Sequence, residues 1–218
     1  MSARKPNMKM EAPRLPHNLP LLELDRLDNG QYIEEGLLQD ASMEYQEAHK
    51  VIVDKTVFRN VDFAECSLIG AELTDVVFDK CDLSNTNFSD AIIHRSEFLD
   101  CKMVGTNLTG ATIRNVRFRQ CLSDYATFRF SDMKSIVLEE CSLIKSDFYH
   151  CKLQKKAIFR QCNIDGAQFS GTELDGIDLS DCDFDGIGVE ADNLKGCLIA
   201  REQAYLFAGL FGLRLKGD

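Results

Sequence analysis

The chain has 218 residues, a length that suits one domain of ordinary size. Its formal net charge of −10 argues against nonspecific nucleic-acid binding and suits a partner with a basic surface. There is no apolar run long enough to cross a membrane and no hydrophobic segment near the start, so we expect a cytoplasmic protein without a span or secretory signal.

Residues 1–50 fit no regular pattern well, and we predict that they form an amino-terminal arm and a cap. The segment APRLPHNLP at 12–20 contains three prolines and indicates an extended arm. Leu38 and Met43 lie in phase with the repeat that follows, so a degraded first coil or cap begins near them. A cap is expected because an open end would expose strand edges and the apolar interior.

Residues 51–200 carry a large apolar residue at every fifth position. The series begins Phe58, Phe63, Leu68, Leu73, Phe78, Leu83, Phe88 and runs to Ile199. It breaks at Ser123, beside the outward candidates Tyr125 and Arg129, and one extra residue enters near position 158. A period of five is neither the 3.6 of a helix nor the 2 of a strand, so the repeat itself is the architecture.

The position two before each large residue is small or β-branched, so two side chains in every five point inward. Such a chain turns at each pentapeptide, and four turns close a square coil of 20 residues. Stacked coils pair as a parallel β-ladder, which predicts an all-β, quadrilateral parallel β-helix of about seven coils. Asp or Asn often precedes the large residue and suits the tight turns, because its side chain binds nearby backbone amides.

Nine cysteines fall on the small inward position: Cys66, Cys81, Cys101, Cys121, Cys141, Cys151, Cys162, Cys182 and Cys197. Six of them recur every 20 residues and are expected to stack as a ladder about 4.8 Å apart. No pair has zinc-finger spacing, and neighbours in a parallel ladder have poor disulfide geometry. We therefore expect buried, free thiols and no metal.

Residues 201–218 leave the repeat and predict a short helix over 201–210, followed by Gly212. This ending is too apolar for a solvated terminus, so part of it is expected to cap the last coil and the rest to join a second copy. The expected dimer interface consists of Tyr205, Leu206, Phe207, Leu210, Phe211 and Leu213.

Catalytic chemistry is not indicated. The four histidines form no motif, and the chain contains no nucleophile elbow, P-loop, dinucleotide fingerprint or zinc-protease motif. The carboxylates lie at repeat positions on a convex exterior, and a narrow coil has no interior pocket for a substrate. We expect a non-enzymatic protein with no cofactor and no small-molecule substrate.

The five-residue repeat resembles the pentapeptide-repeat family over roughly residues 51–200, and this resemblance implies a right-handed β-helix. Within that family the chain is similar to Qnr-type proteins. The similarity rests on the single β-helix of this length, on DYATFRF at 124–130 together with the proline-rich arm, and on the ending EQAYLFAGLFGLRL. It implies tail-to-tail dimers that bind DNA gyrase or topoisomerase IV by mimicking DNA and protect the enzyme from fluoroquinolones. Plasmid-borne members have projecting loops that this chain lacks, so protection would come from the coil itself.

The charge is distributed unevenly along the repeat. Residues 114–160 are net positive, whereas residues 161–200 contain nine acids against Lys195 alone. Over about 10 Å this is about one charge per 1.2 Å, compared with about one per 1.7 Å in duplex DNA. Asp192 falls on an inward position. The expected topoisomerase-binding centre is Asp165, Glu173, Asp175, Asp178, Asp181, Asp183, Asp185 and Glu190.

In a tail-to-tail dimer these acids would meet at the middle of the rod, where they would occupy the basic saddle that otherwise holds DNA. No direct nucleic-acid or membrane binding is expected. Two other functions stay open at this point, an immunity factor against a topoisomerase-poisoning peptide and a general interaction scaffold. The acids could also serve solubility alone.

Overall fold

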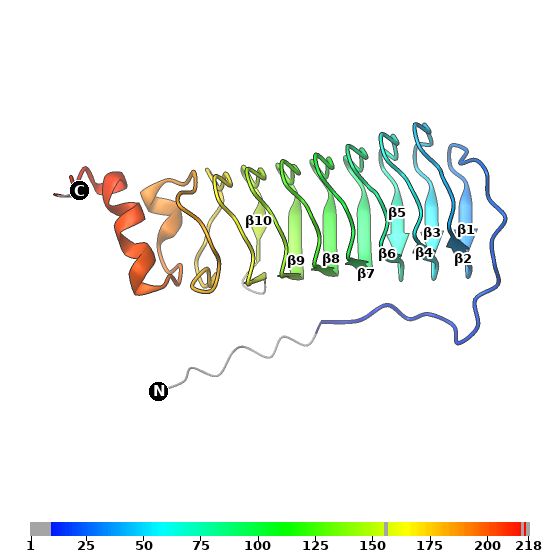
Figure 1. The fold of residues 1–218 in the computed structure, drawn as a ribbon, viewed down its shortest axis with the longest axis horizontal. Helices are drawn as coiled ribbons and strands as arrows, with labels where there is room; N and C mark the ends of the chain where they lie inside the picture. The colour runs from blue at the N-terminus through cyan, green and yellow to red at the C-terminus, as the bar shows by residue number, and fades with distance from the viewer. Residues whose placement is uncertain (1–9, 155–156, 215, 217–218) are drawn as a thin grey trace.

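The computed structural model of the protein describes residues 10–154, 157–214 and 216. The chain winds into a rod of stacked coils with a helix at its carboxyl end (Figure 1). All strand pairs are parallel. The predicted quadrilateral parallel β-helix is thereby confirmed.

The strands and helices follow one another along the chain in a single series. They are β1 (Tyr32–Glu34), β2 (Leu37–Gln39), β3 (Ile52–Asp54), β4 (Val57–Arg59), β5 (Glu72–Thr74), β6 (Val77–Asp79), β7 (Ile92–Leu99), β8 (Thr112–Arg119), β9 (Asp132–Glu139), β10 (Lys152–Leu153), β11 (Ile158–Arg160), and the 3₁₀ helices η1 (Ala191–Leu194) and η2 (Arg201–Phe211).

Two sides of the rod are continuous ladders with a register of 20 residues. The first side runs through β1, β3, β5 and the start of β7, and the second through β2, β4, β6 and the end of β7. Pairing starts at Tyr32, so the regular coil begins about one turn before residue 51. The register changes from 20 at Leu153↔Met133 to 21 at Phe159↔Leu138, which places the extra residue between β10 and β11. Lys155 and Lys156, in the basic stretch there, lie outside the described residues.

The third and fourth sides pair through single bridges, such as Asp62↔Asp82 on the third and Ser67↔Asn87 on the fourth. The residue before the buried central position explains the difference. On these two sides it is often Asp or Asn, whose side chain accepts a bond from the amide two residues on, as in Asp82 Oδ1 with Ser84 N at 2.9 Å. This local bond favours a tight turn over an extended strand. On the first two sides the position often holds a β-branched residue, which favours strands.

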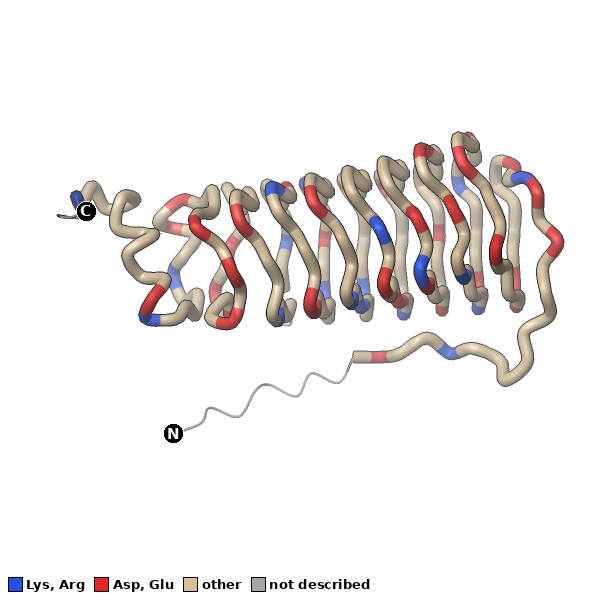
Figure 2. The backbone as a smooth tube through the Cα atoms, in the orientation of Figure 1, with Lys and Arg blue, Asp and Glu red and all other residues tan. Residues whose placement is uncertain are grey.

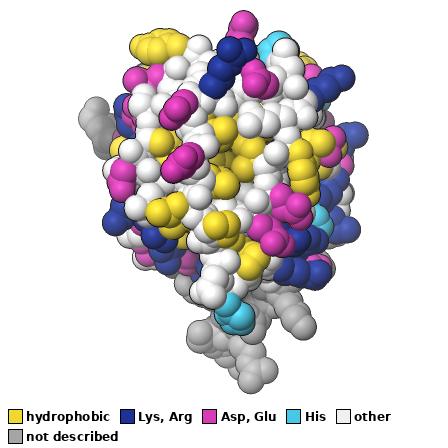
Figure 3. All heavy atoms as spheres, turned by 90° about the vertical axis from the view of Figure 1, so that its right-hand side faces the viewer, with side chains coloured by type: hydrophobic (Ala, Val, Ile, Leu, Met, Phe, Trp, Pro, Cys, Tyr) yellow, Lys and Arg dark blue, Asp and Glu magenta, His cyan; other side chains and the backbone are white. Residues whose placement is uncertain are grey.

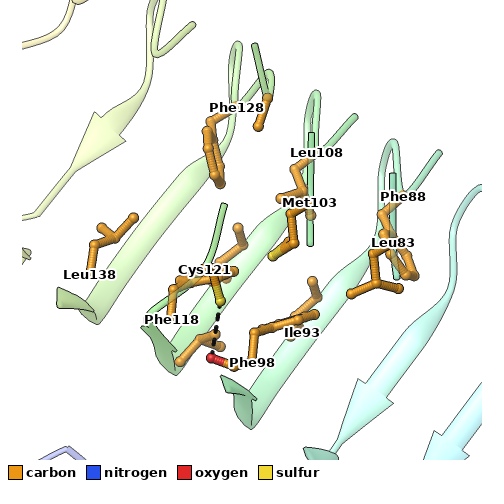
Figure 4. Close-up of a cluster of buried hydrophobic side chains, with 14 of the residues drawn as sticks. Leu83, Phe88, Ile93, Phe98, Met103, Leu108, Phe118, Cys121, Phe128 and Leu138 are labelled. Atoms are coloured by element: carbon orange, nitrogen blue, oxygen red, sulfur yellow. Dashed lines mark hydrogen bonds between the residues drawn. The ribbon is translucent and has the colours of Figure 1, made fainter. Parts of the chain in front are cut away.

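The core is a set of stacked side chains inside the rod (Figure 4). Phe78, Phe98 and Phe118 stack with ring centroids 4.9 and 4.8 Å apart, and Phe128 and Phe148 stack at 4.7 Å. These spacings equal the ladder spacing because each ring sits on the same position of successive coils. One ring therefore cannot shift without displacing its neighbours in the stack.

The cysteines are free, and eight of the nine are buried, while Cys197 is half-buried. In five of the six ladder cysteines the thiol donates to the carbonyl of a stacked central residue, as Cys121 Sγ does to Phe98 O at 3.3 Å (Figure 4). Burial raises the pKa of the Cys182 thiol to about 12 and that of Cys151 to about 11, because a thiolate is poorly solvated there. These thiols fill the core as small apolar groups.

The amino-terminal end of the rod is closed by residues 20–28. The Leu22 side chain packs onto Gly36, where an added Cβ would lie 2.3 Å from Leu22 Cγ, so this position needs glycine. The side chain of Gln46 accepts from Leu27 N at 2.6 Å and donates to Asp25 O at 3.3 Å. Seen from this end, apolar side chains gather at the middle and charged ones surround them (Figure 3).

The carboxyl end is closed by η2. Gln203 Nε2 donates to Cys182 O at 2.8 Å and to Leu179 O at 3.2 Å, so one amide satisfies two carbonyls at the end of the ladder. The Phe207 side chain is buried, with its ring 6.1 Å from that of Phe184. Gly212 follows the helix, as the sequence predicts, and ends it in the left-handed conformation.

The proline-rich arm runs back along the outside of the rod (Figure 1). Arg14 N donates to Asp75 Oδ1 at 2.9 Å, and Glu11 N donates to Asn115 Oδ1 at 3.4 Å. Because Asp75 and Asn115 are 40 residues apart at equivalent corners of the coil, the arm spans two coil steps.

Candidate functional site: the acidic belt

The acids predicted to form the topoisomerase-binding centre lie around the last coils, and we call them the acidic belt. By the coil register Glu173 and Asp175 lie on the first side, Asp178 and Asp181 on the second, Asp165, Asp183 and Asp185 on the third, and Glu190 on the fourth. All are exposed except Asp165, which is half-buried. The belt therefore presents negative charge on every side of the rod.

Asp192 differs from the expectation. It is exposed within η1 rather than pointing inward, because the 3₁₀ helix replaces the pentapeptide turn at this point, although the coil pairing resumes at Leu198. Its carboxylate adds to the charge beside the belt.

Several belt carboxylates bind backbone amides and are held in place by them. Asp165 Oδ1 accepts from Asp185 N at 2.9 Å and from Gly186 N at 3.2 Å, and Glu190 accepts from Gly171 N at 2.9 Å. The bond from Gly171 lowers the pKa of Glu190, so this group is ionised at neutral pH. One oxygen of each carboxylate is thus fixed to the backbone while the charge faces solvent.

In the middle of the rod, bases on neighbouring coils neutralise several of the acids. Such ion pairs are Arg59–Asp79 at 3.1 Å, Arg95–Asp75 at 2.7 Å, Lys102–Asp82 at 2.8 Å, Arg129–Asp147 at 3.1 Å and Arg160–Glu139 at 2.8 Å. Between described residues, no ion pair involves Asp165, Glu173, Asp178, Asp183, Asp185 or Glu190. Blue and red alternate along the middle of the tube, whereas red predominates toward the carboxyl end (Figure 2). Among the described residues, these six belt acids therefore have no ion pair that compensates their charge.

A second group of exposed acids, which the sequence analysis did not single out, lies at the amino-terminal end. Asp40, Glu44, Glu47 and Glu65 belong to it. Two of these accept bonds from amide side chains, Asp40 from Asn60 at 2.8 Å and Glu65 from Asn85 at 2.7 Å. Lys50 and Lys55 lie among them, so this end has a weaker excess of negative charge than the belt.

The residues expected to form a dimer interface divide into two sets. Phe207 is buried and Leu206 packs against the core, so both close the coil of their own chain. Tyr205, Leu210, Phe211 and Leu213 are 57, 41, 65 and 63 % exposed. Leu198, which the sequence did not single out, adds a side chain that is 56 % exposed. These five exposed residues form the apolar end of the rod, next to the belt.

The described part of the chain contains no group of three or more His, Cys, Asp or Glu side chains suited to a metal ion. Within the same residues, no helix has the length and apolar character needed to cross a bilayer. The acidic belt and the apolar end are the two exposed surfaces that the sequence predicted as candidate sites.

Comparison with known proteins identifies the repeat. Residues 71–148 match the family described as "Pentapeptide repeat region", and residues 155–186 match "Pentapeptide repeats (8 copies)". The chain is 40 % identical over 204 residues to the uncharacterized protein YisX of Bacillus subtilis (strain 168), which covers 93 % of this chain and 96 % of that protein.

Solved structures share the fold at lower identity. A trypsin-treated form of QnrB1, a plasmid-mediated fluoroquinolone resistance protein, is 20 % identical with a TM-score of 0.48, covering 92 % of this chain and 100 % of that one. HetL of Nostoc sp. strain PCC 7120, a pentapeptide repeat protein involved in heterocyst differentiation regulation, is 16 % identical with a TM-score of 0.41, covering 79 % and 91 %. Likenesses at this level carry no functional argument.

Proposed function

Because the chain belongs to the pentapeptide-repeat family, we propose that it is a non-enzymatic rod that mimics duplex DNA and binds DNA gyrase or topoisomerase IV. The enzyme's basic DNA-binding saddle would receive the acidic belt. In this role the protein would keep the saddle occupied and protect the enzyme from fluoroquinolones.

The observation that supports this proposal is the contrast between the belt and the middle of the rod. Several mid-rod acids, such as Asp75, Asp79 and Asp82, are paired with bases one coil away, whereas six belt acids have no ion pair among the described residues. Duplex DNA also presents negative charge all around its axis, at about one charge per 1.7 Å. An acidic belt on all four sides resembles that distribution, and a charged patch on one side would not.

A second copy would extend the mimic. Tyr205, Leu210, Phe211, Leu213 and Leu198 expose apolar surface at the end of the rod, and burying it against a second copy is favourable. Two chains joined there would bring both belts to the centre of one longer rod. The net positive segment 114–160 would then lie on either side of the centre and limit the acidic stretch to the saddle.

The experiment is binding of the protein to purified gyrase holoenzyme across a salt series. Changing Asp178, Asp181, Asp183 and Asp185 together to Asn should weaken binding and reduce its salt dependence, because fewer charge contacts form. The matched control changes Asp79, Asp82, Asp90 and Glu97 to Asn or Gln. It removes the same formal charge from the middle of the rod, where Asp79 and Asp82 are already neutralised.

The control should bind almost as well as the unchanged protein. Equal loss for both sets, or loss for neither, would contradict the belt as the contact surface. A gyrase supercoiling assay with and without ciprofloxacin then tests protection itself. Enzyme that remains as sensitive to the drug in the presence of the protein would rule out the protective role.

A further inference from the structure

A cluster of aromatic side chains, two exposed and one half-buried, lies outside the belt on the fourth side of the rod. The Phe130 ring is 5.6 Å from the Tyr149 ring and 6.0 Å from the His150 ring, and the rings of Tyr149 and His150 are 4.3 Å apart. Phe130 is 55 % exposed. We call this cluster, together with Arg129, the aromatic corner.

Arg129 is held against the rings. Its guanidinium carbon lies 4.7 Å from the Tyr149 ring centroid and 5.8 Å from that of Phe130. One nitrogen bonds Asp147 Oδ2 at 3.1 Å, yet 45 % of the side chain stays exposed. A guanidinium fixed in this way loses little further freedom when it binds a carboxylate, which favours binding.

The rings project as a ridge because their neighbours along the rod are glycines. Phe130 and His150 occupy the same corner position in successive coils, which Gly110 occupies before them and Gly171 after them. A Cβ on Gly171 would lie 2.6 Å from the His150 ring, so this glycine makes room for the ring. Phe130 and His150 thus place two rings side by side at this corner, and the positions before and after them carry no side chain of their own.

Folding does not account for Phe130. Its φ of 58° is in the left-handed region, which bulky side chains rarely adopt, and its ring gains little burial there. The other left-handed corners among the described residues hold glycine or a side chain with a polar or charged group, including the aromatic Tyr45 and Tyr125, so Phe130 is the one purely apolar side chain among them. A large apolar side chain at such a turn is explained by contact with another molecule.

We propose that the aromatic corner anchors an apolar, carboxylate-bearing segment of the topoisomerase beside its DNA-binding saddle. This inference rests on the proposed function and adds to it the residues that give specificity. Charge contacts at the belt raise the association rate but recognise any basic groove, whereas aromatic and arginine side chains provide most hot spots at protein interfaces. The partner segment is apolar because it covers the rings, and it carries a carboxylate because 45 % of the Arg129 side chain stays exposed beside its pair with Asp147.

The third side extends this surface on the same coils. Tyr125 is 58 % exposed with Lys145 Nζ 5.7 Å from its ring centroid, and Leu122 is 54 % exposed. A second cation and two further apolar groups fit the same partner chemistry.

The test is binding to purified gyrase holoenzyme at low and high salt, with folding checked by melting temperature. Phe130→Ser should weaken binding at least tenfold without changing the salt slope, because no charge is removed. Phe130→Tyr keeps the ring and should bind within about twofold of the unchanged protein. The matched control is Tyr45→Ser, an aromatic residue that is 74 % exposed, is also left-handed at φ 58°, and makes no ring contact with another described residue. It should have no effect.

Each outcome of these binding measurements either supports the aromatic corner as the anchor or overturns it. If the unchanged protein binds gyrase and Phe130→Ser binds equally well, or Phe130→Tyr is as weak as Phe130→Ser, the aromatic corner is not the anchor while the proposed function stands. If the unchanged protein does not bind a topoisomerase, both proposals fall. Single-stranded DNA binding that is lost in Phe130→Ser would instead assign the corner to nucleic-acid stacking and overturn the inference.

Discussion

Asp75 and Arg95 join two neighbouring coils through a two-pronged ion pair, with Arg95 Nε 2.8 Å from Asp75 Oδ1 and Arg95 Nη2 2.7 Å from Asp75 Oδ2. Asp75 Oδ1 also accepts a hydrogen bond from the backbone N–H of Arg14, so the pair also fixes the amino-terminal arm. The Asp75 side chain is 3 % exposed and that of Arg95 is 16 % exposed.

Removing this carboxylate should therefore destabilise the protein and release the arm. We expect Asp75→Ala to lower the free energy of unfolding by about 2–4 kcal/mol, because the Arg95 charge loses its partner in a largely buried position. Limited proteolysis should then cut the arm faster between residues 10 and 20. Asp90→Ala, an exposed corner acid, is the control. An unchanged melting temperature for Asp75→Ala would contradict the role of the pair.

The same pair predicts a pH dependence. Burial opposes ionisation of Asp75, but the bonds from Arg95 and from Arg14 N outweigh it and hold its pKa below the usual value. A carboxyl with a lowered folded-state pKa stabilises fully above its unfolded pKa of about 4, and this contribution is lost as the pH falls through the folded value. Asp75→Asn should flatten the melting temperature against pH below about pH 4. A profile as steep as that of the unchanged protein would contradict this.

The phenylalanine ladder predicts a large core effect. Phe98 is fully buried and stacks on Phe78 and Phe118, so Phe98→Ala should cost about 3–5 kcal/mol because the neighbouring rings cannot close the gap. Lys102→Ala removes an exposed pair with Asp82 and should cost less than about 1 kcal/mol. Chemical denaturation compares the two. Equal losses of unfolding free energy in the two variants would contradict the register that places Phe98 inside the coil and Lys102 outside it.

The carboxyl cap predicts a local effect. Gln203→Leu leaves the carbonyls of Leu179 and Cys182 without the Gln203 amide, at a cost of about 1–3 kcal/mol for each buried group left unsatisfied. Hydrogen exchange should rise in residues 173–200 and stay unchanged before residue 100, because the coils of a solenoid contact mainly their neighbours. Glu202→Gln is the exposed control. A uniform increase in hydrogen exchange along the whole chain would contradict a local effect of the cap.

The apolar end predicts an oligomeric change without unfolding. Replacing Leu210 and Phe211 by Ser should convert a dimer to a monomer in light scattering at micromolar concentration, while the melting temperature of the coil barely changes, because both side chains are exposed within the chain. Phe207→Ser should instead lower the melting temperature, since Phe207 is buried in its own chain. If the protein without substitutions is monomeric in light scattering, the proposed dimer is wrong.

The buried thiols predict slow, pH-dependent labelling. At pH 8 the folded protein should react slowly with a thiol reagent, and Cys197 should react first because it alone is half-buried, even though burial raises its pKa to about 11. Labelling should accelerate as the pH approaches that value, and all nine cysteines should react in denaturant. Rapid labelling of Cys182 in the folded protein would contradict its place in the core.

The five-residue period was sufficient to predict the coil, its core and its thiol ladder. Each pentapeptide has two inward side chains and one turn. The same local pattern therefore recurs at every turn of the coil and can be recognised in the sequence. The side chains of Asp82 and Asn87 bind amides two residues on, which is also local information. The inserted residue was visible because it shifted every later apolar position by one.

Contacts between distant residues were decided only by the tertiary structure. Nothing in the sequence pattern indicates that Arg14 binds Asp75, that Leu22 packs on Gly36, or that Gln203 binds the carbonyls of Leu179 and Cys182, because the arm and caps lie outside the repeat. Likewise, counting charges gave the acidic excess at residues 161–200, but the geometry decided which acids are neutralised. A base neutralises an acid here when the 20-residue coil brings their side chains together, and this depends on the stacking of coils rather than on composition.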